Sequence, residues 1–235
     1  VTRDYTLANT SGVSYTAGSS TITVTRHWTD SGTKFAYGTS SVILNGDGTL
    51  TGPTAFKDIS LAYSGKTTTL ASSSSTAFNT YSNGVLTFNG GVIAGASKTI
   101  YTHPTTTSTP VVFASPTSLT GTGIIVHQGD AASITVTVAA ANYGDWSVHV
   151  EGRQANNTYN LASGTLTTTG YFIVKSSGSG SNTVFNTQNN NLTAGFFYFG
   201  ASGATNSTTA NFGLSTINLT HGADSLAVQN NAGSN

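Results

Sequence analysis

The side chains that could carry out acid–base or metal chemistry are few in this sequence. Eight Asp and Glu residues and five His residues occur among 235. Their densest grouping comprises two nearby stretches, VHQGD at 126–130 and GDWSVHVEGR at 144–153. Enzymes that cleave polysaccharides need two carboxyl groups close together, one as an acid and one as a base or nucleophile. Asp145 and Glu151 are therefore the best candidates for such a pair.

The same stretches suggest a metal site, because neutral imidazole is a good ligand for transition metals. His127 and His149 are 22 residues apart, so a repeat of that length would stack them beside the neighbouring carboxylates. The structural alternative places both histidines in an outward-facing ladder, while Glu151 pairs with a basic side chain, Arg153 or Lys175. We favour this alternative, and we expect no catalytic residue, no metal and no other cofactor. Neither a nucleophile elbow, a phosphate loop nor an HExxH zinc motif occurs.

Composition limits the classes of partner. Charged residues make up 7% of the chain and the formal net charge is zero, whereas ordinary globular domains contain about 25% charged residues. The main electrostatic attraction to nucleic acids or anionic membranes is therefore missing. No run reaches the roughly 18 apolar residues of a membrane helix, so we predict no membrane span. Cys and Met are both absent, which excludes disulfides and cysteine-based metal sites.

The pattern of β-branched residues predicts an all-β fold. Apolar and polar residues alternate in TITVT at 21–25 and in SITVTV at 133–138, as they do in strands with one buried face. Turn-forming Asn-Gly pairs interrupt these runs, for example at 45–46 and 83–84. Long runs of the helix-favouring residues Ala, Leu, Glu and Lys are missing.

A phrase of Gly followed by large apolar residues recurs from residue 119 onward. Its clearest copies are LTTTGYFIVKSSG at 166–178 and NLTAGFFYFGASG at 191–203. The glycines of successive phrases lie 21, 26, 25 and 27 residues apart, at Gly123, Gly144, Gly170, Gly195 and Gly222. A period of this length predicts a parallel β-solenoid with one coil per repeat. In that fold Gly supplies a corner with a tight or left-handed backbone, and the apolar residues after it fill the core.

The stretch Arg26–Leu61 resembles the repeats of bacterial and archaeal surface adhesins that fold as right-handed β-helices. Those repeats typically have the pattern W-T-x-x-G-x-F-x-x-G-x-S-x-V-x-F-N-G-x-G-x-x-T-G-x-x-x-F-x-x-L. The matching residues here are Trp28, Thr29, Gly32, Phe35, Gly38, Val42, Leu44, Asn45, Gly46, Gly48, Thr51, Gly52, Phe56 and Leu61. The resemblance implies a surface β-solenoid and no particular activity.

A β-sandwich or jelly roll is the alternative fold, because it too has short strands at regular spacing. Sandwich subunits of pili can be linked by a strand that one subunit donates to the next. Tyr5, Thr6 and Leu7 would be the donated strand here. We accordingly divide the chain into an N-terminal strand segment, 1–25, with a capping or donated role, and one β-rich domain, 26–235.

An unusually aromatic strand follows Gly195. Because neighbouring residues of a strand point to opposite faces, two of its four aromatic residues should face the core and two should face outward. A similar pattern occurs one coil earlier. Outward aromatic rings on a surface with few charges predict a contact with another subunit or with a glycan. The candidate contact residues are Tyr171, Phe172, Phe196, Phe197, Tyr198 and Phe199.

Five Asn-x-Ser/Thr sequons permit N-glycosylation in a secreted protein. They begin at Asn9, Asn156, Asn191, Asn206 and Asn218. Asn, Ser and Thr are so abundant that a similar number would arise by chance. Asn206, in GATNSTTA, is the best candidate for an exposed turn.

Together these features predict a secreted structural protein that assembles with copies of itself into an extracellular filament, pilus-like fibre or sheath on a microbial cell surface. A first residue of Val1 rather than Met is typical of a product from which a leader has been removed. Strand edges with almost no charge to block them favour polymerisation, and few charges should make assembly insensitive to pH and salt. The alternatives are a surface adhesin or phage receptor-binding fibre that recognises glycans, and a polysaccharide-degrading β-helix enzyme.

Overall fold

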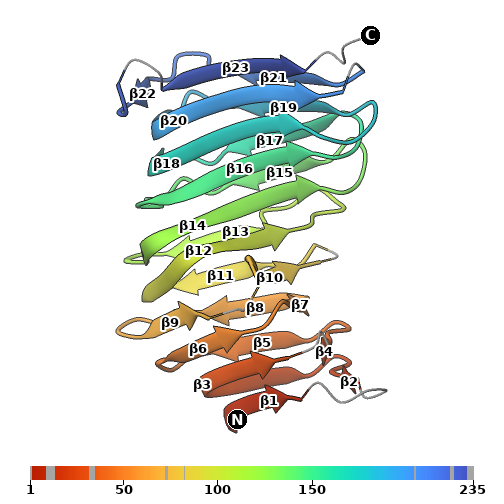
Figure 1. The fold of residues 1–235 in the computed structure, drawn as a ribbon, viewed down its shortest axis with the longest axis vertical. Helices are drawn as coiled ribbons and strands as arrows, with labels where there is room; N and C mark the ends of the chain where they lie inside the picture. The colour runs from red at the N-terminus through yellow and green to blue at the C-terminus, as the bar shows by residue number, and fades with distance from the viewer. Residues whose placement is uncertain are drawn as a thin grey trace. The chain divides into compact units, whose positions relative to one another are not determined.

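The computed structural model describes residues 2–8, 14–31, 35–71, 74–81, 83–203, 205–222 and 225–231. The regular elements in these ranges are 23 strands (Figure 1). Every ladder described between two named strands is parallel. The all-β, parallel β-solenoid prediction is therefore confirmed. The sandwich alternative is wrong for the described residues, because sandwich sheets are antiparallel.

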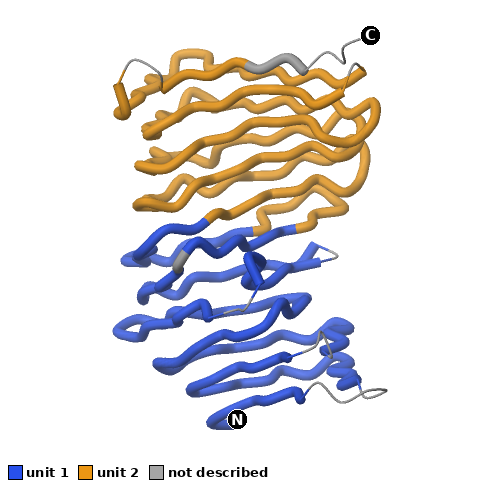
Figure 2. Tube along the Cα trace, viewed as in Figure 1, with its two compact units in different colours: residues 1–102, 111–123 blue, residues 103–110, 124–235 orange. Residues whose placement is uncertain are grey.

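The chain is divided by its contacts into two compact units (Figure 2). Unit 1 comprises residues 1–102 and 111–123, and unit 2 comprises residues 103–110 and 124–235. The expected boundary between residues 25 and 26 falls inside one strand, Thr21–Asp30. Across the part of the chain that the structure describes, no helix has the length and hydrophobicity needed to cross a membrane.

Unit 1 is built by stacking short strands of successive coils. Its strands are β1 (Thr2–Leu7), β2 (Tyr15–Thr16), β3 (Thr21–Asp30), β4 (Phe35–Ala36), β5 (Ser41–Leu44), β6 (Gly48–Thr51), β7 (Thr54–Phe56), β8 (Asp58–Leu61), β9 (Thr67–Leu70), β10 (Thr76–Thr80), β11 (Leu86–Asn89), β12 (Val92–Thr102), β13 (Val111–Ala114) and the start of β14 (Ser118–Gly129). Val42 pairs with Ile59, Ile59 with Leu86, and Leu86 with Val111. All four are at most 1% exposed. Alternation along each strand thus sends like residues into one core.

Unit 2 has the same construction with longer strands. It contains the end of β14, β15 (Thr135–Val138), β16 (Trp146–Gly152), β17 (Asn157–Leu161), β18 (Thr165–Ser176), β19 (Asn182–Asn186), β20 (Asn191–Ser202), β21 (Ser207–Asn211), β22 (Ile217–Leu219) and β23 (Leu226–Asn231). Strands β16, β18, β20 and β23 pair in succession, as Figure 1 shows. Strands β15, β17, β19 and β21 form a separate four-stranded sheet.

The repeated glycine phrase sets the register of unit 2. Tyr171 pairs with Phe196, so the two clearest copies of the phrase lie directly above one another. Gly144 has a φ of 57°, which side-chain-bearing residues seldom adopt. A Cβ on Gly195 would lie 1.9 Å from the carbonyl oxygen of Thr169. The difference from expectation is that Gly195 lies inside the long strand β20, not at a corner between two strands.

Asn side chains form a ladder along the four-stranded sheet. Asn186 Nδ2 donates to Asn160 Oδ1 at 2.9 Å, and Asn211 Nδ2 donates to Asn186 Oδ1 at 2.8 Å. We call Asn160, Asn186 and Asn211 the amide ladder. Stacked amides of this kind satisfy one another from coil to coil. These three asparagines therefore link successive coils of the sheet.

Candidate functional site

The buried carboxylate of unit 2 is Glu151, on β16. Gln128 Nε2 donates to its Oε2 at 3.0 Å, and Lys175 Nζ lies 3.3 Å from the same oxygen. Ser177 Oγ donates to Oε1. Burial opposes ionisation, but these hydrogen bonds and the Lys175 charge outweigh it and lower the pKa of Glu151. Three partners hold this carboxylate ionised, as is typical of a structural group. The ion pair between Glu151 and Lys175, one of the two expected from the sequence, is present.

A second polar cluster surrounds Asp130. His103 Nδ1 lies 2.8 Å from Oδ2, and Arg153 NH1 donates to Oδ1 at 3.2 Å. Burial lowers the pKa of His103, against the opposing effect of Asp130. Because an ionised carboxylate can only accept, the neutral imidazole donates its Nδ1 proton to Asp130. Arg153 therefore pairs with Asp130, and not with Glu151.

The two central histidines do not stack as their spacing suggested. Gln128 bonds to Glu151 and Arg153 bonds to Asp130, so residues 23 positions apart lie beside each other on these two coils. The same offset places His127 beside Val150, which belongs to the core. His127 is fully buried and His149 is half-buried. Burial lowers the pKa of His127 to about 4, and burial together with a nearby lysine lowers that of His149 to about 4. Both imidazoles are neutral at pH 7.

The geometry does not support the proposed acid–base pair. Asp145 precedes β16 and Glu151 lies near its end, and six residues of strand span about 20 Å. Glycosidase carboxyl pairs are roughly 5–9.5 Å apart. The Asp145 carboxylate accepts a hydrogen bond from Thr169 instead. In the described ranges there is also no group of three or more His, Asp and Glu residues placed to hold a metal ion.

The aromatic strand divides between the two faces of β18 and β20. Phe172 is fully buried and Phe197 is 3% exposed, so these two expected contact residues belong to the core. Phe199 shares their face because it lies two residues beyond Phe197. Tyr171, 48% exposed, stacks on Phe196 with ring centroids 4.6 Å apart.

The outward aromatic residues are Tyr171, Phe196 and Tyr198. Phe196 also contacts the ring of His221, at 4.1 Å between centroids. Because the rings stack on one another along the coils, most of their faces are already covered. Tyr171 is the most exposed of the three, whereas Phe196 and Tyr198 are half-buried.

The expected donated strand lies in β1. Tyr5 pairs with Trp28, Thr6 with Thr29 and Leu7 with Asp30, all within the same chain. The ring of Tyr5 stacks on that of Trp28 at 4.4 Å. A strand donated from β1 to another subunit would first have to leave this ladder.

The sequons occupy different environments. Asn156, Asn191 and Asn218 are exposed, whereas Asn206 is half-buried. The Asn206 amide bonds to Ser202 O and accepts from Ser181 N at 3.1 Å, so it holds the turn between β20 and β21. Asn9 lies outside the described residues.

The core columns of unit 2 become exposed at the last coil. Pairing places Val148, Phe172, Phe197 and Leu226 in one column, and Val150, Val174, Phe199 and Val228 in the next. Val148 and Val150 are fully buried, whereas Leu226 is 60% and Val228 70% exposed. The same apolar column is therefore covered at one end and open at the other.

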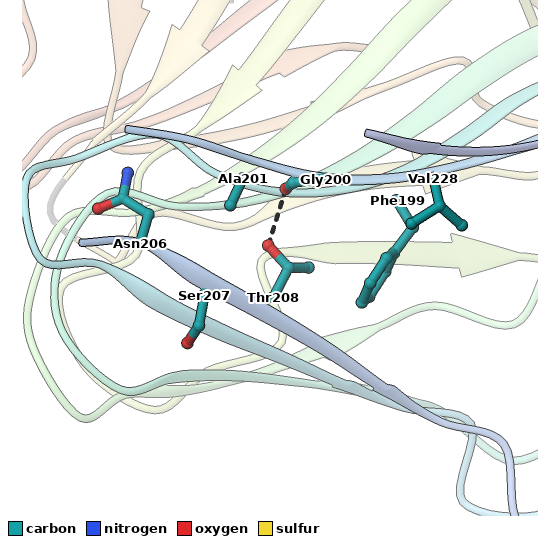
Figure 3. A pocket seen from close by; sticks show the side chains of 7 residues that line it. All are labelled: Phe199, Gly200, Ala201, Asn206, Ser207, Thr208 and Val228. Carbon is teal, nitrogen blue, oxygen red and sulfur yellow. Dashed lines mark hydrogen bonds between the residues drawn. The ribbon is translucent and has the colours of Figure 1, made fainter. Parts of the chain in front are cut away.

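Two hollows are lined by residues of β20, by β21 with its flanking residues, and by β23. One of about 310 Å³ is lined by Phe199, Gly200, Ala201, Asn206, Ser207, Thr208 and Val228 (Figure 3). The other, of about 240 Å³, is lined by Phe197, Phe199, Ala210, Phe212, Leu226 and Val228. They share Phe199 and Val228, so together they form a trough along β21, which we call the end trough. Thr208 Oγ1 donates to Gly200 O at 2.7 Å across it (Figure 3).

The three strands at the open end, β21, β22 and β23, are uncharged, because they contain no Asp, Glu, Lys or Arg. Among the described strands, β21 pairs with β19, and β22 and β23 pair with β20. Sequence reasoning missed Leu226 and Val228 because their alternation is the same as that of the covered strands. The structural signal is the exposure of these two side chains, at 60% and 70%.

The fold and this site define a parallel β-solenoid with an uncovered apolar end. Comparison of the chain with protein-family models, with curated proteins and with solved structures found no match.

Proposed function

We propose that this chain is an extracellular structural protein whose copies associate end to end into a filament or sheath. The observation that carries the proposal is the open core column at the last coil of unit 2. Fully burying a large aliphatic side chain contributes about 1.5–3 kcal/mol. Covering Leu226 and Val228, which are 60% and 70% exposed, would therefore contribute about 2–4 kcal/mol, before any strand hydrogen bonds.

Parallel stacking makes the two ends of such a molecule complementary. Each parallel strand presents the same pattern of donors and acceptors toward the next coil, so a second copy of the same polarity can continue the ladder. An interface between two different surfaces of one protein generates an open polymer unless its rotation closes a ring. Natural proteins usually protect sheet edges with charge or Pro, and β21, β22 and β23 have neither.

The extracellular assignment rests on composition. Cys and Met are absent, which removes the most readily oxidised side chains from a surface fibre. Hydroxyl and amide side chains keep the outer faces polar without charge.

The test is negative-stain electron microscopy and sedimentation of the untreated protein and two variants. We expect wild-type filaments and loss of assembly in Val228→Asp, because the carboxylate would have to be buried at the joint. The matched control is Val112→Asp on β13, where Val112 is 41% exposed and pairs within its sheet. A monodisperse wild-type monomer, or unchanged filaments in Val228→Asp, would refute the proposal.

Glycan binding is the second candidate function, favoured by the exposure of Tyr171, which is 48%. An exposed tyrosine has the apolar ring and the polar hydroxyl that contacts with a sugar require. A protein that stays monomeric and binds glycans on an array, with binding lost in Tyr171→Ala, would support this function over assembly. An adhesin or receptor-binding fibre would behave in this way.

A further inference from the structure

We infer that Asn45 deamidates spontaneously in the folded protein, in preference to the other two asparagines that precede a glycine. The Asn-Gly pairs of the chain are Asn45-Gly46, Asn83-Gly84 and Asn89-Gly90. Asparagine is among the thermolabile residues, and a following glycine has no side chain to shield its nitrogen. This inference concerns a covalent modification of the chain, and it does not depend on the proposed assembly.

The reaction needs an accessible backbone nitrogen and a mobile side-chain amide. The glycine nitrogen loses its proton and attacks Cγ of the asparagine, and the bond between Cγ and the amide nitrogen breaks. The amide takes up a proton from water and leaves as ammonia, so that a cyclic succinimide remains. Water then opens the ring at either carbonyl, which gives aspartate or isoaspartate. No oxidant or reductant takes part.

The first pair meets both requirements. Asn45 is exposed and lies with Gly46 in the loop between β5 and β6. Among the residues that the structure describes, neither the Asn45 side chain nor the Gly46 nitrogen forms a hydrogen bond. The backbone nitrogen of Asn45 donates to Val24 O at 3.2 Å, which holds the loop without restraining the side chain. The Asn45 amide can therefore rotate toward the nitrogen that attacks it.

The neighbouring carboxylate, Asp47, is already engaged. Its Oδ1 accepts a hydrogen bond from Thr67 N at 2.8 Å, and its Oδ2 accepts one from Lys66 Nζ at 3.2 Å. These two contacts lower the pKa of Asp47, which makes it a weaker base. Hydroxide from the solvent is therefore the base that removes the proton from Gly46.

Hydrogen bonds restrain the other two pairs. Gly84 is buried, and its nitrogen donates to Tyr81 O at 3.0 Å. The nitrogen of Gly90 donates to Thr117 Oγ1 at 3.1 Å, and Asn89 Nδ2 donates to two backbone carbonyls. These bonds must break by local opening before the ring can close. The fold therefore slows the reaction at these two sites.

Isoaspartate at position 45 would disturb the stacking of coils. Gly46 packs so closely on the preceding coil that a Cβ there would lie 1.6 Å from Thr25 O. Leu44, at the end of β5, pairs with Val24. An isoaspartyl link adds a carbon to the backbone path directly after Leu44, so the loop cannot keep both contacts. We expect deamidated molecules to unfold at a lower urea concentration.

Peptide mass spectrometry after incubation at pH 8.5 in heavy-oxygen water tests the inference, because the label marks only product formed during incubation. The folded protein is compared with the same protein in urea. In the folded protein we expect Asn45 to react about tenfold faster than Asn83 or Asn89, each of which must first give up hydrogen bonds. In urea the three sites should react at similar rates, because no fold distinguishes them.

Two variants complete the experiment, and circular dichroism confirms that each one folds. Asn45→Gln should abolish the product at position 45, because the longer side chain closes a ring less readily. Thr117→Val removes the acceptor of the Gly90 nitrogen and should speed the reaction at Asn89 severalfold. Equal rates at the three sites in the folded protein, the same ranking in urea, or an unchanged rate at Asn89 in Thr117→Val would overturn the inference.

Discussion

Acid should destabilise this protein through His127 and His149, whose pKa values the fold lowers most strongly. Burial lowers the pKa of His127 and His149 from 6.5 to about 4. Between pH 6.5 and pH 4 the unfolded chain therefore binds protons at these imidazoles that the folded chain does not bind. Folding stability consequently falls as the pH drops from 6.5 toward 4. Each pH unit in that window costs about 1.4 kcal/mol per imidazole. At pH 5 the loss is about 2 kcal/mol for each histidine, or about 4 kcal/mol for both.

The perturbation that isolates this effect is His127→Leu. Urea unfolding at pH 7.5 and pH 5.0 gives the free energy of unfolding at each pH. We expect the variant to lose about 2 kcal/mol less than the wild type between the two values, because the contribution of the His127 imidazole is gone. At pH 5 the Glu151 carboxylate contributes little to the change, since its lowered pKa affects stability mainly below its ordinary value.

The control is Val150→Ala, which removes core volume beside His127 without removing a titrating group. It should lower the free energy of unfolding by a similar amount at both pH values. If His127→Leu shows the same pH dependence as wild type, the imidazole is not held neutral in the fold and the burial argument is refuted. Because His127 and His149 lower folding stability below about pH 6.5, we expect any insensitivity of assembly to pH only above that value.

Three further predictions concern the coils themselves. Asn186→Ala breaks both hydrogen bonds of the amide ladder and should cost about 1–3 kcal/mol in urea unfolding. Gly195→Ala places a methyl group 1.9 Å from Thr169 O and should abolish the cooperative transition or lower its midpoint sharply, whereas Gly180→Ala, with no atom within 4 Å, meets only backbone strain. Glu151→Gln removes a buried charge-assisted network and should cost about 1.5–3 kcal/mol at pH 7, with circular dichroism confirming that the fold is retained. Unchanged unfolding in Asn186→Ala or Glu151→Gln would show that these bonds are not formed in solution.

Local pattern was sufficient to predict the class of fold. Alternation of β-branched and polar residues specifies strands with one buried face, and the recurring glycine phrase specifies a coil period. The recurring phrase also placed the two aromatic segments one coil apart, and Tyr171 pairs with Phe196. These features depend on steric preferences of the backbone and on the two-residue period of a strand, which are properties of short segments.

The candidate sites depended on information that no short segment contains. His127 and His149 have the spacing of a stacked pair, but the bonds between β14 and β16 join residues 23 apart, and a shift of one residue moves a side chain to the opposite face. Leu226 and Val228 have the pattern of any core strand. Their exposure is decided by whether another strand covers them, which is a property of the stacked coils and not of the residues. The sequence by itself determined the strands and their buried faces, whereas the register between coils and the open apolar end were decided by the tertiary structure.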